Sequence, residues 1–151
     1  MTLSRHSQDM SQVKSATIKA QLDQVGPVSE SMADAAVHSD DDQDLHFRIN
    51  IALTEAITNS VIHGCANNGS DLIRVEYELQ GENHVFHIFD PGKGPCPELL
   101  ERPVLSEDPL AESHRGMVIM KWAADEMNYT RGNDCFCLSM LFRSRRTAGA
   151  E

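Results

Sequence analysis

The sequence predicts an α+β two-layer sandwich, in which a mixed β-sheet has helices on one face. One long segment has apolar residues at every fourth position, and several short segments alternate between apolar and polar side chains. The predicted order along the chain is strand, helix, helix, hairpin, loop, helix, hairpin. We expect the strands to form one mixed sheet and the helices to cover one face of it.

The N-terminal part of the chain is predicted to hold one strand and one helix. Residues 1–13 are polar and are expected to be flexible. Residues 16–22 alternate between apolar and polar side chains, which predicts a half-buried strand. We expect Gly26-Pro27 to break the regular structure, and residues 28–38 to form a helix.

Residues 43–63 are the most regular segment and predict an amphipathic helix that Gly64 ends. Its apolar stripe consists of Ile49, Leu53, Ile57 and Val61. A polar ladder of Glu55, Asn59 and His63 has the same spacing but lies about 200° away around the helix. The stripe should face the core and the polar ladder should face elsewhere.

The second half of the chain predicts two hairpins with a helix between them. Residues 71–79 and 85–89 flank a turn at 81–83, and the second of these strands is apolar enough to be central. Further predicted elements are a helix over 116–125, strands over 127–130 and 135–142, and a flexible tail over 143–151.

Composition fits one globular domain, which we place at residues 14–142 of the 151. The formal net charge of -10 argues against non-specific binding to nucleic acid or to an anionic membrane, because both need a basic surface. Four cysteines, no signal peptide and no apolar run of membrane-spanning length predict a cytoplasmic protein with reduced thiols. Cys135 and Cys137 lack the second ligand pair of a zinc site.

Three short motifs are candidates for chemistry. In the first, a carboxylate at Glu55 can accept a proton and an amide oxygen at Asn59 suits Mg²⁺; the alternative is a solvated helix face. Glu55 is, however, the single charge within residues 51–62, which favours chemistry.

The second motif is Asp90-x-Gly92-x-Gly94, directly after the predicted central strand. The carboxylate can accept a hydrogen bond from an exocyclic amine, and the glycines let the backbone approach a flat ligand. An ordinary turn is the alternative.

The third motif is His114-Arg115-Gly116, predicted to open a helix whose free N–H groups suit a phosphate. A plain glycine near a helix start is the alternative.

Taken together and in this order, the three motifs resemble those of the GHKL ATPase superfamily. Within it, "ALTEAITNSVIHG" and "RGMVIMKWAADEMNY" look like the anti-sigma factor serine kinases of bacterial partner-switching systems. The resemblance extends over about residues 16–142 and implies the Bergerat, or histidine-kinase-like ATPase, fold.

The resemblance implies a role for each site residue. Glu55 would be the general base, and Asn59 would hold Mg²⁺ bridging the phosphates of ATP. Asp90 would bind the adenine amine. The remaining residues would surround the nucleotide: His63, Gly92, Gly94, Arg115 and Gly116. Residues 95–113 would form a lid over ATP.

Two positions depart from the family pattern. His114 stands where a glycine is usual, so its side chain would either crowd the phosphates or add a contact to them. Asp134-Cys135 replaces a Gly-Thr pair, which removes a hydroxyl expected near the adenine.

The function implied is that of an ATP-dependent serine protein kinase and anti-sigma factor. It would bind a sigma factor and phosphorylate an anti-anti-sigma protein with a STAS domain, and the family suggests a homodimer. One alternative is a non-catalytic or differently targeted binding module. Another is a metal-dependent hydrolase using Glu55, His63 and either His46 or His87, although no H-E-x-x-H motif is present.

Overall fold

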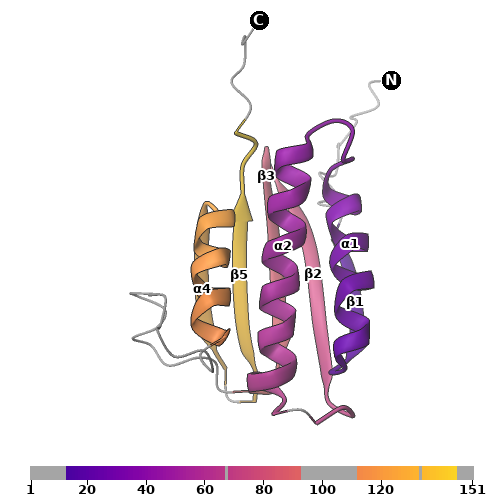
Figure 1. Cartoon of the computed structure of the whole chain (residues 1–151), viewed down its shortest axis with the longest axis vertical. Coiled ribbons are helices and arrows are strands. Elements are labelled where there is room, and N and C mark those ends of the chain that lie inside the picture. Colours follow the sequence, from indigo (N-terminus) through magenta and orange to yellow (C-terminus); the bar gives the residue numbers. More distant parts are fainter. Residues whose placement is uncertain (1–12, 67, 93–111, 133, 146–151) are drawn as a thin grey trace, which may run out of the picture.

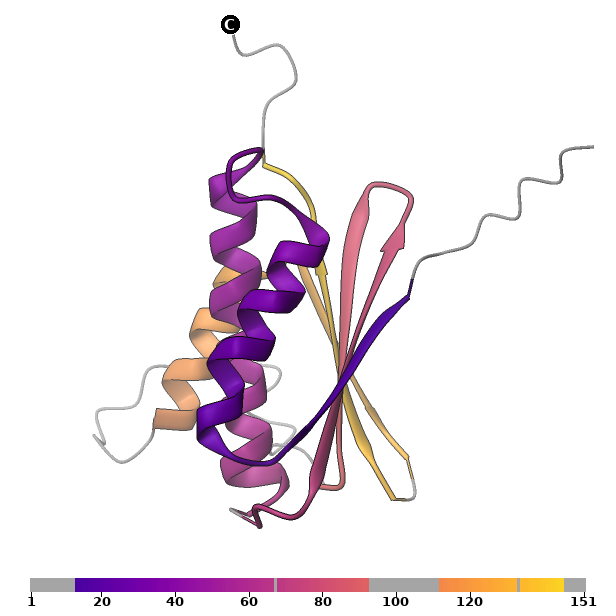
Figure 2. The ribbon, with the colours of Figure 1, turned by 90° about the vertical axis from the view of Figure 1, so that its right-hand side faces the viewer.

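The computed structural model describes residues 13–66, 68–92, 112–132 and 134–145, except for the side chains of residues 112–114. These residues form a five-stranded sheet and three α-helices, all on one face of the sheet (Figure 1, Figure 2). The predicted two-layer sandwich is therefore confirmed. Most of the predicted flexible ends lie outside the described residues. None of the helices in the described segments is long and apolar enough to cross a membrane.

The N-terminal strand β1 spans Lys14–Lys19, and a short 3-10 turn η1 (Leu22–Gln24) joins it to helix α1 (Val25–Ala36). The predicted break at Gly26-Pro27 is wrong, because both residues lie in the first turn of α1. Proline is tolerated there, since the N–H that it lacks would have no partner inside the helix. The chain instead changes direction through η1.

Helix α2 spans Gln43–Asn59 and continues directly into a π-helical turn, η2 (Ser60–Gly64). Asp42 caps its start, where the N–H of Leu45 donates a hydrogen bond of 3.0 Å to the aspartate side chain. All four residues of the predicted apolar stripe are buried against the sheet. The predicted end at Gly64 is confirmed, but the last turn is π-helical rather than α-helical.

Strands β2 (Leu72–Gln80) and β3 (Asn83–Asp90) form the predicted hairpin. Gly81 at the turn has a φ of 62°, in the left-handed region that favours glycine. The predicted central strand is confirmed, because β3 lies between β2 and β5.

Helix α4 (Glu112–Ala123) is followed by the second predicted hairpin, β4 (Glu126–Arg131) and β5 (Phe136–Phe142). The predicted helix start at Gly116 is wrong, because α4 begins four residues earlier. Glycine is a poor helix former, so sequence alone favoured placing it at the end of the helix.

The sheet has the strand order β1-β2-β3-β5-β4, and every neighbouring pair is antiparallel. The predicted mixed sheet is therefore corrected for the described strands. The helices α1 and α2 connect β1 to β2, and β2 runs in the opposite direction to β1. β3 and β4 do run parallel, but β5 lies between them and is antiparallel to both.

A fully buried arginine holds the start of α2 against the end of α4. Arg48 has no exposed surface and forms ion pairs with Asp44 at 2.8 Å and with Asp125 at 3.6 Å. It also donates hydrogen bonds to the carbonyl oxygens of Ala123 at 3.1 Å and Arg143 at 2.8 Å. We call Arg48, Asp44 and Asp125 the Arg48 cluster.

The residues just after β5 are anchored to the same end of the molecule. The N–H of Arg143 donates to Asp125 at 2.7 Å, and the hydroxyl of Ser144 donates to Asp42 at 2.7 Å. Arg145 donates to the carbonyl oxygen of Trp122 at 3.1 Å. These contacts hold residues 143–145, which the sequence analysis assigned to the tail, against the helices.

Candidate functional site

The predicted site residues that the structure describes gather at one end of the molecule, where α2 and β3 end and α4 begins. In Figure 1 this end of the molecule is at the bottom, where α2 ends and α4 begins. The two helices pack against each other. Asp90 is the last residue of β3 and pairs with Phe136, the first residue of β5. Segments far apart in the sequence therefore meet at this end.

Glu55 and Asn59 lie on the side of α2 that faces α4. A Cβ atom on Gly116 would lie 2.9 Å from Oε2 of Glu55 and 3.4 Å from Nδ2 of Asn59. Both polar side chains are half-buried. This pair is therefore part of an interface between two helices, and the alternative of a solvated helix face does not apply to it.

The structure gives Gly116 a different role from the one that the sequence analysis expected. It lies in the second turn of α4, beyond the first-turn N–H groups that a helix leaves free for an anion. Its missing side chain instead allows α4 to approach Glu55 and Asn59 closely.

Asp90 accepts hydrogen bonds from two different segments. The hydroxyl of Ser60 donates to Oδ2 at 2.7 Å, and the N–H of Gly92 donates to Oδ1 at 2.7 Å. Because Ser60 directly follows Asn59, the first bond joins the second motif to the end of the helix that bears the first motif.

Two glycines allow the backbone after β3 to contact the end of η2. A Cβ atom on Gly92 would lie 2.5 Å from Cα of Gly64, and one on Gly64 would lie 2.6 Å from Cγ of Asp90. The space beside Gly92 is thus filled by Gly64, whereas the sequence analysis expected it to accommodate a flat ligand. Gly64 was predicted only as a helix end, and the structure shows that its lack of a side chain also makes room for Asp90.

Burial dominates the electrostatics around Asp90. It raises the pKa of this carboxyl group above the ordinary value of 3.8, while the hydrogen bonds from Ser60 and Gly92 lower the pKa. Burial also raises the pKa of the Cys65 thiol to about 11, with smaller contributions from the charges of Asp90 and Asp71. Cys65 is therefore a neutral thiol at neutral pH and not a reactive thiolate.

The other predicted site residues are not brought into these contacts. His63 is exposed, because the π-helical turn ends the four-residue repeat that aligned Glu55 with Asn59. Arg115 is exposed in α4. Gly94, nearly all of the predicted lid and the side chain of His114 lie outside the described residues.

The sequence analysis did not identify Ser60 as a site residue. Its position next to Asn59 was the available signal, but α2 also contains Thr54 and Thr58, whose hydroxyl groups look alike in sequence. The contact that distinguishes Ser60 comes from Asp90, thirty positions away, and local spacing does not reveal it.

A bound Mg²⁺ ion would find few protein ligands here. Within the described segments, no three His, Cys, Asp or Glu side chains come together as a metal site. The half-buried amide of Asn59 fits Mg²⁺, which keeps several waters and often uses one or two protein ligands together with substrate phosphates. The alternative of a metal-dependent hydrolase likewise finds no cluster of metal ligands among the described residues.

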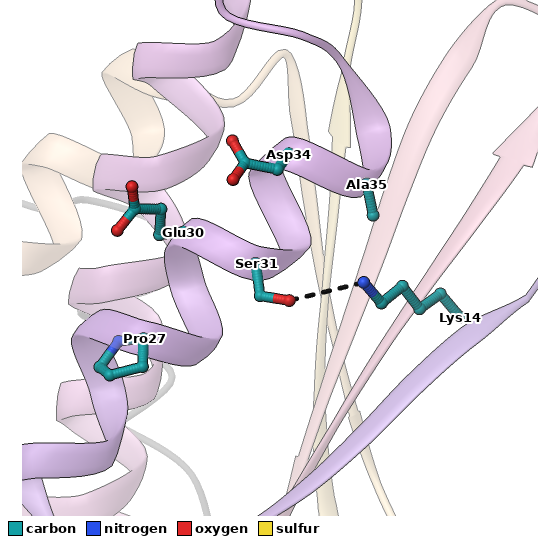
Figure 3. A pocket seen from close by; sticks show the side chains of 6 residues that line it. All are labelled: Lys14, Pro27, Glu30, Ser31, Asp34 and Ala35. Atoms are coloured by element: carbon teal, nitrogen blue, oxygen red, sulfur yellow. Dashed lines mark hydrogen bonds between the residues drawn. The ribbon is translucent and has the colours of Figure 1, made fainter.

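The described residues also form two hollows on the surface, and the second of them includes a site residue. The first has a volume of about 550 Å³, lies between β1 and α1 (Figure 3), and is lined by Lys14, Pro27, Glu30, Ser31, Asp34 and Ala35. Lys14 donates a hydrogen bond of 3.5 Å to Ser31 across it, and none of the predicted site residues lines it. The second, of about 440 Å³, reaches Asp90 where the Arg74 guanidinium lies 4.3 Å above the Phe89 ring.

The fold places the chain in a known class of ATPase domains. The histidine kinase-like ATPase domain family matches residues 18–142, which include nearly all of the described helices and strands. The chain belongs to this family, and the predicted fold family is confirmed.

Within this family, the chain is similar to curated anti-sigma F factors. It is 33% identical over 79 residues to one from Clostridium botulinum and 32% identical over 89 residues to one from Clostridium beijerinckii. These alignments cover 51% and 56% of this chain, and 55% and 62% of the relatives. The chain thus spans little more than half the length of the curated relatives that it matches.

A solved structure has the same fold. The crystal structure of the RsbU and RsbW domains of Rv1364c from Mycobacterium tuberculosis matches with a TM-score of 0.61 and 17% sequence identity. The match covers 91% of this chain and 34% of that one. At this level of identity, the similarity establishes the fold alone.

Proposed function

We propose that this chain is an ATP-dependent serine protein kinase and anti-sigma factor of a bacterial partner-switching system. One observation carries the proposal: motifs distant in sequence converge on the end of α2. Glu55 and Asn59 contact the position of Gly116, and Ser60 bonds to Asp90. Membership of the ATPase family and similarity to proteins named anti-sigma F factor support it further.

Glu55 is the general base of the proposed reaction. It accepts the proton of a serine hydroxyl on the protein substrate. The serine oxygen forms a bond to the γ-phosphorus of ATP while the bond from that phosphorus to the ADP oxygen breaks. Glu55 and Asn59 are four residues apart, so the base and the phosphate-binding group lie on one helix face.

The remaining residues position ATP. Asn59 would hold Mg²⁺, which would neutralise charge on the phosphates. Asp90 accepts a hydrogen bond from the adenine amine. Arg115 is exposed and adds a charged contact to the phosphates. The other nucleotide contacts that we propose come from His63, Gly92, Gly94 and Gly116.

The proposed partners are proteins. In one state the chain binds a sigma factor, and in the other it phosphorylates an anti-anti-sigma protein with a STAS domain. The net charge of -10 favours a basic segment on the sigma factor. We further propose that the chain works in the cytoplasm and forms a homodimer. Sedimentation of the purified protein tests the homodimer.

Transfer of labelled phosphate from ATP to a candidate STAS-domain protein tests the enzyme directly. Glu55→Gln should lower the transfer rate by at least about 100-fold, the usual contribution of a general base. Glu82→Gln, at the exposed turn of the first hairpin, is the matched control and should keep the wild-type rate. Equal transfer by wild type and Glu55→Gln would remove Glu55 from the mechanism, and no transfer by either would remove the kinase.

A non-catalytic binding module is the second candidate function. It is favoured by His114 at the position where the resembling family has a glycine. Calorimetry with Mg-ATP separates the two candidates, since a module that switches partners by binding alone should give no heat with ATP and still bind its protein partner.

A further inference from the structure

Ser60 and Asp90 form a buried hydrogen-bonded pair at the proposed adenine site. Ser60 is 7% exposed and Asp90 is 5% exposed. The Ser60 hydroxyl donates a hydrogen bond to Oδ2 of Asp90 at 2.7 Å. The N–H of Gly92 donates to the other oxygen, Oδ1, at the same distance. Because the donors belong to η2 and to the segment after β3, together they fix the plane of the carboxylate.

The surroundings leave the carboxylate little room to turn. A Cβ atom on Gly64 would lie 2.6 Å from Oδ1 and 2.7 Å from Oδ2 of Asp90, so the backbone of η2 lies directly against both oxygens. The neighbouring buried thiol of Cys65 is neutral at neutral pH. The hydrogen bonds to Asp90 thus come from neutral groups, a hydroxyl and a backbone N–H.

The acceptor sites left on Asp90 suit an amine and repel a carbonyl oxygen. A carboxylate has about four lone-pair sites, and Ser60 and Gly92 occupy one each. The remaining sites can accept the exocyclic amine of adenine. Hypoxanthine and guanine have a carbonyl oxygen at the same ring position, so lone pairs would face lone pairs. This selection requires the carboxylate to stay ionised and oriented, and donation from Ser60 favours both.

We propose that Ser60 is a positioning residue that makes the site selective for adenine over 6-oxopurines by fixing the carboxylate of Asp90. The inference rests on the proposed ATP binding. Ser60 acts through Asp90, so its loss should reduce discrimination between purines more than it reduces nucleotide binding in general.

Calorimetric titration of the full chain with Mg-ADP and with Mg-IDP tests this. Wild type should bind ADP more tightly than IDP. Ser60→Ala should weaken ADP binding by about tenfold, the lower range for a hydrogen bond to a charged group, and should change IDP binding by less than about threefold. Ser29→Ala is the matched control, because Ser29 is fully buried in α1 and its hydroxyl has no hydrogen-bond partner among the described residues. It should keep the wild-type ratio.

Each outcome decides a specific point. A Ser60→Ala protein that keeps the wild-type ADP/IDP ratio, or loses both affinities equally, overturns the role of Ser60 while ATP binding stands. A wild type that binds neither nucleotide overturns the proposed function itself. Should Ser60→Ala fail to fold, Ser60→Cys keeps the side-chain size with a weak donor, and unchanged discrimination in that variant overturns the inference equally.

Discussion

The buried charges at the two ends of α2 are stabilised by different kinds of partner. Near its start, Arg48 is fully buried and is neutralised by the carboxylates of Asp44 and Asp125. At its other end, the buried carboxylate of Asp90 is held by the neutral donors Ser60 and Gly92. One end is balanced by charges of the protein itself, and the other is supported by hydrogen bonds alone.

This difference separates stability from binding along one helix. The Arg48 cluster is satisfied without a ligand, so its effect should be on the free energy of unfolding. The carboxylate of Asp90 keeps acceptor sites for an outside donor and costs stability when ionised, which is typical of a binding group. Substitutions at the two ends should therefore have different consequences.

The largest effect on stability is expected from Arg48→Met. It removes the ion pairs with Asp44 and Asp125 and leaves the carbonyl oxygens of Ala123 and Arg143 without the donor that Arg48 supplies, and should lower the free energy of unfolding by about 3 kcal/mol. Urea denaturation measures this change. Arg74→Met is the control, because Arg74 is half exposed and forms one ion pair with Glu76 at 3.2 Å, so the loss should stay below about 1 kcal/mol. Equal losses in the two variants would contradict the structural role of the cluster.

Gly64→Ala should come second and act at the other end. The new methyl group would lie 2.6 Å from the Asp90 carboxylate, and overpacking of this kind costs about 1–3 kcal/mol. Urea denaturation and Mg-ADP titration should both show a loss. Gly69→Ala is the matched control, since the nearest side-chain atoms to its Cβ position belong to Gln21 at 3.5 Å, an ordinary contact distance, and both measurements should stay near the wild-type values. A Gly64→Ala protein as stable as wild type would show that the contact relaxes freely.

Asp90→Asn should remove a pH dependence of stability. Burial raises the folded-state pKa of Asp90 above its ordinary value of 3.8, so the folded protein binds this proton more tightly than the unfolded chain. The stabilisation is fully present below that ordinary value and is lost as pH rises through the folded-state pKa. Asparagine does not ionise, so stability measured by urea denaturation should shift in favour of the variant as pH rises above about 4. Parallel pH curves for the two proteins would contradict the predicted shift.

The smallest change in stability is expected for Gly116→Ala. Alanine gains up to about 1 kcal/mol in a helix, and the contact at 2.9 Å with the flexible end of Glu55 offsets part of this gain. Phosphate transfer should nevertheless fall by at least about tenfold, because small displacements of a catalytic group are costly. Denaturation and transfer assays on one sample measure both. An unchanged transfer rate would show that Glu55 tolerates the methyl group.

Local patterns in the sequence were sufficient for most elements of the fold. The apolar stripe of α2 and the alternation in the two hairpins follow from periodicity, which each segment displays by itself. The alignment of Glu55 with Asn59 follows from the same helical spacing. His63 did not follow, because the helix changes to a π-helical turn after Asn59.

Contacts between distant segments could not be predicted in this way. The burial of Arg48, the bond from Ser60 to Asp90 and the place of Gly116 inside α4 all depend on a partner from another element. The antiparallel sheet also depends on β5 inserting between β3 and β4, which no local pattern records.

The insertion of β5 has a consequence for the growing polypeptide on the ribosome. The chain emerges from its N-terminus, so β3 and β4 are made before the strand that joins them. Until residues 136–142 have left the exit tunnel, the edge of β3 that ends in Asp90 is open. A nascent chain therefore completes the proposed nucleotide site only with β5, and translation arrest before that strand leaves an unpaired edge exposed to aggregation.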